Sequence, residues 1–149
     1  PAKKPPPEEA DMTNKPTPTV LIVDDDATVR HSYRAALRAV DCLTDSATNG
    51  EQALSAMQAR PYDVVLLDLR MPGMDGMGVL QKMKQSWPES EVVIITGYPS
   101  VDSAKEAVRL GASDYLSKPL GPDEIVGAAR EAITRKQWTL RQNLTRSIR

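Results

Sequence analysis

Hydrophobic residues of this chain gather in short continuous runs that are separated by longer amphipathic segments. Runs of β-branched and aliphatic residues are typical of strands that are buried on both faces of a parallel sheet. Three such runs predict strands at 20–23, 64–68 and 92–96, and two shorter segments predict further strands at 43–47 and 114–117.

Between these strands, apolar residues recur at the spacing of an amphipathic helix. Asp75 and Ser100 stand where a side chain can cap the start of a helix, and Gly111 stands where a helix can end. The predicted helices lie at 27–40, 50–60, 76–86 and 101–110, with a last helix that begins near Pro122.

Strands and helices therefore alternate strictly along the chain. Alternation of this kind implies a parallel sheet with helices on both faces, joined by right-handed crossovers. Five units are too few for an eight-stranded barrel, so we predict an α/β fold with flavodoxin-like (βα)5 topology. This is a three-layer sandwich whose parallel sheet has the strand order 2-1-3-4-5.

Both ends of the chain differ from this pattern. Residues 1–18 are rich in proline and are expected to form a disordered tail, and the domain proper is expected at 19–136. Residues 137–149 continue the helical pattern, with Leu140 and Leu144 near one face. Two interpretations of 137–149 stay open: an extended last helix that frays, or a dimerising linker toward a further domain.

Composition narrows the class of protein. No apolar run approaches the roughly 20 residues that a membrane-spanning helix needs, and no signal peptide is visible. Cys42 is the single cysteine, so no internal disulfide can form, and a reducing cytoplasm is expected. The net charge is −1, with a basic C-terminal end and an acidic body, which argues against nucleic-acid binding by the body.

The predicted strand order brings acidic residues together. Asp24 and Asp25 follow the first strand, and Asp68 ends the third strand, which is its neighbour in the sheet. The carboxyl edge of such a sheet is where open α/β folds bind ligands. Clustered carboxylates repel one another unless a cation lies among them, and a few carboxylates with water suit Mg²⁺.

Two further strand ends supply groups that act on phosphate. Thr96 ends the fourth strand with a hydroxyl group, and Lys118 follows the fifth strand with an ammonium on a flexible arm. A carboxylate nucleophile, a divalent cation, a hydroxyl and a lysine are the parts needed for phosphoryl transfer to an aspartate. We therefore interpret Asp68 as the reactive residue.

These residues also carry a resemblance to a known family. The chain resembles the CheY-like receiver domain of bacterial two-component response regulators over about residues 19–136, and is similar to receivers of the nitrogen-regulation class. The matching segments are Val23-Asp24-Asp25, Leu67-Asp68-Leu69-Arg70-Met71-Pro72-Gly73-Met74-Asp75-Gly76, Ile95-Thr96-Gly97 and Tyr115-Leu116-Ser117-Lys118-Pro119.

The resemblance implies specific roles for the site residues. Asp68 would accept a phosphoryl group from a sensor histidine kinase, and Mg²⁺ would be held by Asp24, Asp25, Asp68 and the backbone carbonyl of Arg70. Asp26 is left outside the acidic pair, and a one-residue slip would bring it in place of Asp24.

The resemblance also implies a switch. Thr96 would move toward the phosphoryl group and Tyr115 would rotate inward behind it, which changes the face formed by the fourth helix, the fifth strand and the fifth helix. The Lys118–Pro119 peptide bond is expected to be cis, as in family members.

The expected function is signalling through a phosphoacceptor domain, not turnover of a substrate. The implied partners are the kinase, a downstream effector protein, and a second copy bound through the switch face or the C-terminal helix. Alternatives are a receiver portion cut from a larger regulator and a degenerate receiver that acts as an interaction scaffold. A Mg²⁺-dependent phosphohydrolase is a weaker rival, because Leu69 and Arg70 follow Asp68 where such an enzyme carries a second acid.

Overall fold

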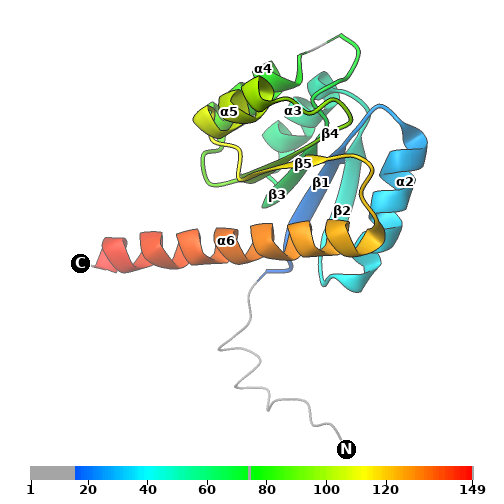
Figure 1. Cartoon of the computed structure of the whole chain (residues 1–149). Coiled ribbons are helices and arrows are strands. Elements are labelled where there is room, and N and C mark those ends of the chain that lie inside the picture. The colour runs from blue at the N-terminus through cyan, green and yellow to red at the C-terminus, as the bar shows by residue number, and fades with distance from the viewer. Residues whose placement is uncertain (1–15, 74, 149) are drawn as a thin grey trace, which may run out of the picture.

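A computed structural model describes residues 16–73 and 75–148, so residues 1–15 of the predicted tail at 1–18 lie outside the described residues. Its sheet has the order β2-β1-β3-β4-β5, and every neighbouring pair is parallel, which confirms the predicted topology (Figure 1). The strands are β1 (Thr19–Val23), β2 (Leu43–Ala47), β3 (Val64–Leu67), β4 (Glu91–Thr96) and β5 (Asp114–Ser117).

The helices connect these strands as the sequence predicts. The helices are α2 (Ala27–Ala36), α3 (Gly50–Ala59), α4 (Gly76–Ser86), α5 (Val101–Arg109) and α6 (Pro122–Ile148). Among the described residues, no helix combines the length and the apolar composition that crossing a bilayer requires.

The first helix ends earlier than expected. A helix over 27–40 was predicted, but α2 ends at Ala36 and a 3-10 turn, η1, covers Leu37–Ala39. The backbone N–H of Val40 donates to the carbonyl of Leu37 at 3.0 Å, and Val40 itself is extended. Such tighter bonds satisfy carbonyls that have no partner at a helix end.

The two faces of the sheet are covered by different helices. Side chains of successive strand residues point to opposite faces, so Leu21 and Val23 join one core cluster while Val20 and Ile22 join the other. Residues of α3, α4 and α5 pack in the first cluster, and residues of α2 and α6 pack in the second. The fold is therefore the predicted three-layer sandwich.

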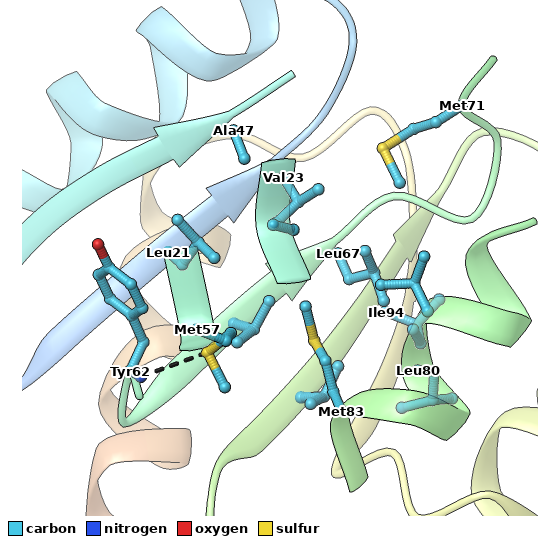
Figure 2. Packing of buried hydrophobic residues seen from close by; sticks show 14 of the residues in the cluster. Leu21, Val23, Ala47, Met57, Tyr62, Leu67, Met71, Leu80, Met83 and Ile94 are labelled. Carbon is cyan, nitrogen blue, oxygen red and sulfur yellow. Dashed lines mark hydrogen bonds between the residues drawn. The ribbon is translucent and has the colours of Figure 1, made fainter. Parts of the chain in front are cut away.

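Figure 2 shows the cluster on the α3–α5 face. Met57 of α3 and Met83 of α4 lie over the strand residues Leu21, Leu67 and Ile94, and all five side chains are fully buried. Flexible methionine side chains fill irregular gaps between helix and sheet. This packing fixes the strands relative to one another, and therefore also fixes Asp24 and Asp68, which follow β1 and β3 at the carboxyl edge of the sheet (the acidic edge).

Polar contacts attach α6 to the amino-terminal edge of the sheet. The Arg135 Nε atom lies 3.0 Å from Glu91 Oε1, and the Asn143 amide donates to Glu89 Oε1 at 3.0 Å. The Lys136 ammonium lies 3.9 Å from Asp63 Oδ1. The helix runs without a break past residue 136, and its C-terminal half projects beyond the sheet (Figure 1).

The buried phenol of Tyr62 makes a contribution to stability that depends on pH. Its side chain is buried, and its hydroxyl donates to Asp45 Oδ2 at 2.6 Å. Burial, and next the hydrogen bond to Asp45, raise the pKa of the Tyr62 phenol above 10.0. Folding therefore favours the neutral phenol, and this stabilisation is fully present below pH 10.0 and is lost as pH rises through the raised pKa.

We predict that Tyr62→Phe lowers the free energy of unfolding by about 1 kcal/mol at neutral pH, because one hydrogen bond is lost. The difference from wild type should shrink as the pH rises above 10.0, because the phenol of the unfolded chain then ionises while the buried phenol is still neutral. Urea denaturation across this pH range measures both effects. A difference that stays constant with pH would contradict the stabilising role of the neutral phenol.

Candidate functional site

The acidic edge is positioned by the ladder between β1 and β3. Val23 pairs with Leu67, so the next residues of the two strands, Asp24 and Asp68, stand side by side. The backbone N–H of Asp68 donates to the Val23 carbonyl at 3.0 Å, and that of Asp24 donates to the Ala47 carbonyl of β2 at 3.2 Å. The backbone at both acids is therefore fixed by the sheet.

Three carboxylates face one another at this edge. Asp24, Asp25 and Asp68 each offer an oxygen, and these three atoms lie within 4.8 Å of one another. The side chains of Asp24 and Asp68 are buried, whereas Asp25 is exposed. Two members of the cluster are therefore enclosed by the protein, and solvent can reach the cluster at Asp25.

Asp26 has a different role from its two neighbours. It is the N-cap of α2, and its Oδ1 accepts a hydrogen bond from the Thr28 N–H at 2.9 Å. The backbone N–H of Asp26 donates to Asp24 Oδ1 at 2.9 Å. Asp26 therefore orients the carboxylate of Asp24 and starts the helix, and it stands outside the carboxylate group that could hold a metal.

Lys118 reaches the acids from the end of β5. Its Nζ atom lies 2.7 Å from Asp24 Oδ2 and 3.3 Å from Asp68 Oδ2. Burial acts to lower the pKa of the Lys118 ammonium, but the hydrogen bond to Asp24 and the charges of Asp24 and Asp68 outweigh it, so the pKa is raised. The Lys118–Pro119 peptide bond is cis, as the resemblance to receiver domains implied.

The carboxyl of Asp68 has a perturbed pKa. Burial raises the pKa of Asp68 above its ordinary value, and the charge of Asp24 raises it further. The backbone N–H of Arg70, which donates to Asp68 Oδ1 at 3.1 Å, and the Lys118 ammonium act in the opposite direction. Shifted pKa values from burial and close charges are common at reactive residues.

The donor set fits a hard divalent cation. The cluster holds three carboxylates, and the Lys118 ammonium contacts two of them, so a surplus of negative charge is left. Oxygen ligands with access to water are what Mg²⁺ prefers. Asp24, Asp25 and Asp68 could hold such an ion together with a backbone carbonyl of the following loop.

Thr96 and Tyr115 stand on the neighbouring strands β4 and β5. Thr96 is buried, and its Oγ1 accepts a hydrogen bond from the Tyr98 N–H at 3.1 Å. The Tyr115 ring is partly buried against the α3–α5 core, and its hydroxyl accepts a hydrogen bond from the Ser100 N–H at 3.2 Å. The structure thus links both residues to the loop between β4 and α5.

Two contacts of arginines were missed by the sequence analysis. The Arg30 guanidinium donates to the Asp24 carbonyl at 2.7 Å, and the Arg70 guanidinium lies 4.1 Å from the centroid of the Tyr98 ring. Helix side chains lean toward the N-terminus, so the position of Arg30 in the first turns of α2 was a usable signal. The Arg70–Tyr98 pair joins two loops that are distant in sequence.

Gly76 lets the loop after Asp68 close tightly. A Cβ at Gly76 would lie 2.5 Å from both the Cα and the carbonyl oxygen of Leu69. The Gly76 N–H donates to that same carbonyl at 3.2 Å. The backbone of the loop after Asp68 is therefore set by the absence of a side chain at the start of α4.

An acidic cluster with a lysine therefore lies at the carboxyl edge of a five-stranded flavodoxin-like sheet, which is the arrangement that the resemblance to receiver domains implies. Comparison with known proteins agrees: residues 20–130 match the response regulator receiver domain family. The chain belongs to that family.

Its relatives include regulators of the nitrogen-regulation class, as expected. It is 39% identical over 118 residues to the DNA-binding transcriptional regulator NtrC of Salmonella typhimurium, covering 79% of this chain and 25% of NtrC. It is 41% identical over 114 residues to the transcriptional regulatory protein ZraR of Klebsiella oxytoca, covering 76% of this chain and 26% of ZraR. The chain thus spans about a quarter of the length of these curated relatives.

A solved structure shows the same fold. The receiver domain of NtrX from Brucella abortus superposes with a TM-score of 0.72 and 32% identity, covering 77% of this chain and 98% of that domain. The likeness to receivers of longer regulators agrees both with the main expectation of a response regulator receiver and with the alternative of a receiver portion of a larger protein.

We predict that Gly76→Ala weakens binding of Mg²⁺ at least several-fold and lowers stability by about 1–3 kcal/mol, because the added Cβ must displace the Leu69 backbone. Gly78→Ala is the matched control, since a Cβ there meets nothing within 4 Å and alanine favours the helix. Isothermal titration with Mg²⁺ and thermal melting measure both variants. Equal behaviour of the two would contradict the role given to Gly76.

Proposed function

We propose that this receiver accepts a phosphoryl group on Asp68 from a sensor histidine kinase. The observation that carries the proposal is the convergence at Asp68 of an ammonium 3.3 Å away and two further carboxylates within 4.8 Å. The Lys118 ammonium can neutralise phosphoryl oxygens, and the carboxylates of Asp24 and Asp25 can hold the cation that phosphoryl transfer requires. A nucleophile without these neighbours would face an uncompensated negative phosphate.

The transfer is a substitution at phosphorus. An Asp68 carboxylate oxygen forms the new O–P bond while the N–P bond of the donor phosphohistidine breaks, and the leaving imidazole takes up a proton. When bound, Mg²⁺ would supply charge neutralisation for phosphoryl oxygens, held by Asp24, Asp25, Asp68 and the backbone carbonyl of Arg70. Lys118 would pair with a second phosphoryl oxygen, and the hydroxyl of Thr96 would donate to a third.

We propose that the added charge switches one face of the molecule. An aspartyl phosphate brings about −1.5 to −2 charges to a site that is already acidic. Thr96 would leave its bond with the Tyr98 N–H to reach the phosphoryl group, and Tyr115 would turn inward behind it. The face that changes is formed by α5, β5 and α6, which are the fourth helix, fifth strand and fifth helix of the receiver.

The proposed role is that of a phosphoacceptor which assists its own phosphorylation and dephosphorylation and turns over no other substrate. We propose a downstream effector protein or domain as its output partner, action in the cytoplasm, and no direct contact of this chain with nucleic acid or membrane. Residues 19–136 would form the receiver, and 137–149 would serve as a helical extension or linker.

Phosphorylation can be tested by weighing the intact protein. Incubation with acetyl phosphate and Mg²⁺ is expected to add about 80 Da, the mass of one phosphoryl group in place of a proton. Asp68→Asn should abolish the adduct, because the amide is a poor nucleophile. Chelation of Mg²⁺ should abolish it as well.

Asp26→Asn is the matched control, because asparagine also caps helices well and Asp26 contributes no carboxylate to the cluster. This variant should still gain the adduct. If the wild-type protein gains no adduct with any phosphodonor, the proposal is contradicted, and a receiver that acts as a scaffold is favoured.

We also propose that the receiver self-associates through one of two exposed apolar surfaces. Leu140 and Leu144 are 45% and 63% exposed on the projecting half of α6, and Val101 and Val108 are 71% and 66% exposed on α5. Exposed apolar side chains that recur on one helix often mark an interface. The basic side chains of α6 would oppose a parallel pairing at low salt.

Sedimentation of the phosphorylated protein is expected to show a concentration-dependent dimer. The paired substitutions Leu140→Gln with Leu144→Gln, and Val101→Ser with Val108→Ser, remove one surface each. We expect one pair to abolish the dimer and the other to leave it intact, which identifies the interface. A wild-type protein that stays monomeric at all concentrations would refute self-association.

A further inference from the structure

A network of hydroxyl groups ties Tyr115 to the start of α5. The Tyr115 hydroxyl makes a short hydrogen bond with Ser103 Oγ, and it accepts a bond from the Ser100 N–H at 3.2 Å. Ser100 is the N-cap of α5, and its Oγ accepts from the Ser103 N–H at 3.0 Å. The tyrosine hydroxyl is therefore part of the cap of the helix.

One assignment of hydrogens satisfies every group in this network. The Ser103 hydroxyl donates to the Ser100 carbonyl at 3.2 Å, and the Ser100 hydroxyl donates to Ser103 Oγ at 2.9 Å. The Tyr115 hydroxyl then donates to Ser103 Oγ and accepts from the Ser100 N–H. Each donor is used once, so withdrawal of the Tyr115 hydroxyl leaves partners of the cap unmatched.

The network lies next to the proposed switch. Tyr115 pairs with Ile94 in the ladder between β5 and β4, two residues before Thr96. The loop that follows Thr96 bonds at Tyr98 to the Thr96 hydroxyl and at Ser100 to the Tyr115 hydroxyl. A short stretch of chain therefore restrains both residues that the proposed switch would move.

We infer that Ser103 is a positioning residue that holds Tyr115 at the start of α5 and thereby opposes switching of the receiver. The inference rests on the proposed function, because it assigns a regulator to the same switch. Inward rotation of Tyr115 breaks its bonds to Ser103 and Ser100, so this network sets how much of the receiver is switched before phosphorylation. If only a fraction of the molecules is in the switched state before binding, the apparent affinity for a phosphoryl mimic is reduced in proportion to that fraction.

The test uses beryllofluoride with Mg²⁺, which mimics a phosphoryl group on a carboxylate, and amide NMR spectra of the whole chain. The midpoint is the beryllofluoride concentration at which the change in the Gly97 and Ser100 amide signals is half complete. Ser103→Ala is expected to lower this midpoint roughly three- to ten-fold, the range for loss of one hydrogen bond. Ser103→Thr keeps the hydroxyl and should restore the wild-type midpoint.

A double-mutant cycle distinguishes loss of the Ser103–Tyr115 hydrogen bond from simple loss of the helix cap. Tyr115→Phe removes the other end of the bond and should lower the midpoint similarly. Ser103→Ala placed on Tyr115→Phe should then add less than about a two-fold change, because the two groups act as a pair. Ser46→Ala on the exposed edge strand β2 is the control serine and should leave the midpoint unchanged.

Each outcome decides the inference. An unchanged or raised midpoint in Ser103→Ala, or the same effect of Ser103→Ala with and without the Tyr115 hydroxyl, overturns it. Thermal melting of each variant excludes unfolding as the cause, and Ser103→Thr supplies a folded comparison. Failure of the proposed function is seen separately, because the wild-type protein would then show no beryllofluoride shift and no phosphoryl adduct.

Discussion

Carboxylates of Asp24, Asp25 and Asp68 lie within 4.8 Å of one another and repel. At such distances the repulsion between the two buried carboxylates, Asp24 and Asp68, costs on the order of a few kcal/mol. Lys118 offsets part of this cost through contacts at 2.7 and 3.3 Å with Asp24 and Asp68. The sheet supports the arrangement because its ladder continues through the backbone of both buried acids.

The same repulsion explains why the site is suited to change. A cluster that carries more negative than positive charge binds a cation readily and responds strongly when a phosphoryl group adds further charge. The surrounding core is close-packed and cannot deform smoothly, so the change is carried by loops and single side chains. In the proposed switch these would be the loop from Thr96 to Ser100 and the ring of Tyr115, which hydrogen bonds connect.

Much of this arrangement could be predicted from the sequence, because it depends on periodicity and strand order. Buried runs located β1, β3 and β4, and the topology rule for alternating units placed Asp24, Asp25 and Asp68 at one edge. The sequence left the role of Asp26 open, and in the structure this residue caps α2 through its hydrogen bond with the Thr28 N–H.

Other features depend on side-chain directions that periodicity does not encode. The bond from Arg30 to the Asp24 carbonyl, the stacking of Arg70 on Tyr98, and the Ser103–Tyr115 bond each join segments whose relative placement emerges only in three dimensions. The early end of α2 depends likewise on local hydrogen bonding at Leu37 and Val40, which outweighs helical spacing that extends to residue 40.

Because α6 is a continuous helix, it also fixes the rotational orientation, about its own axis, of whatever follows its C-terminal end. Its 27 residues span about 40 Å, and each residue advances the helix by about 100° of rotation. Because Arg135, Lys136 and Asn143 attach it to the sheet edge, any group joined to its end inherits a set rotational phase relative to the acidic edge. A one-residue insertion after Asn143 would turn that group to a different side, whereas a seven-residue insertion would nearly restore its bearing about 10 Å farther out.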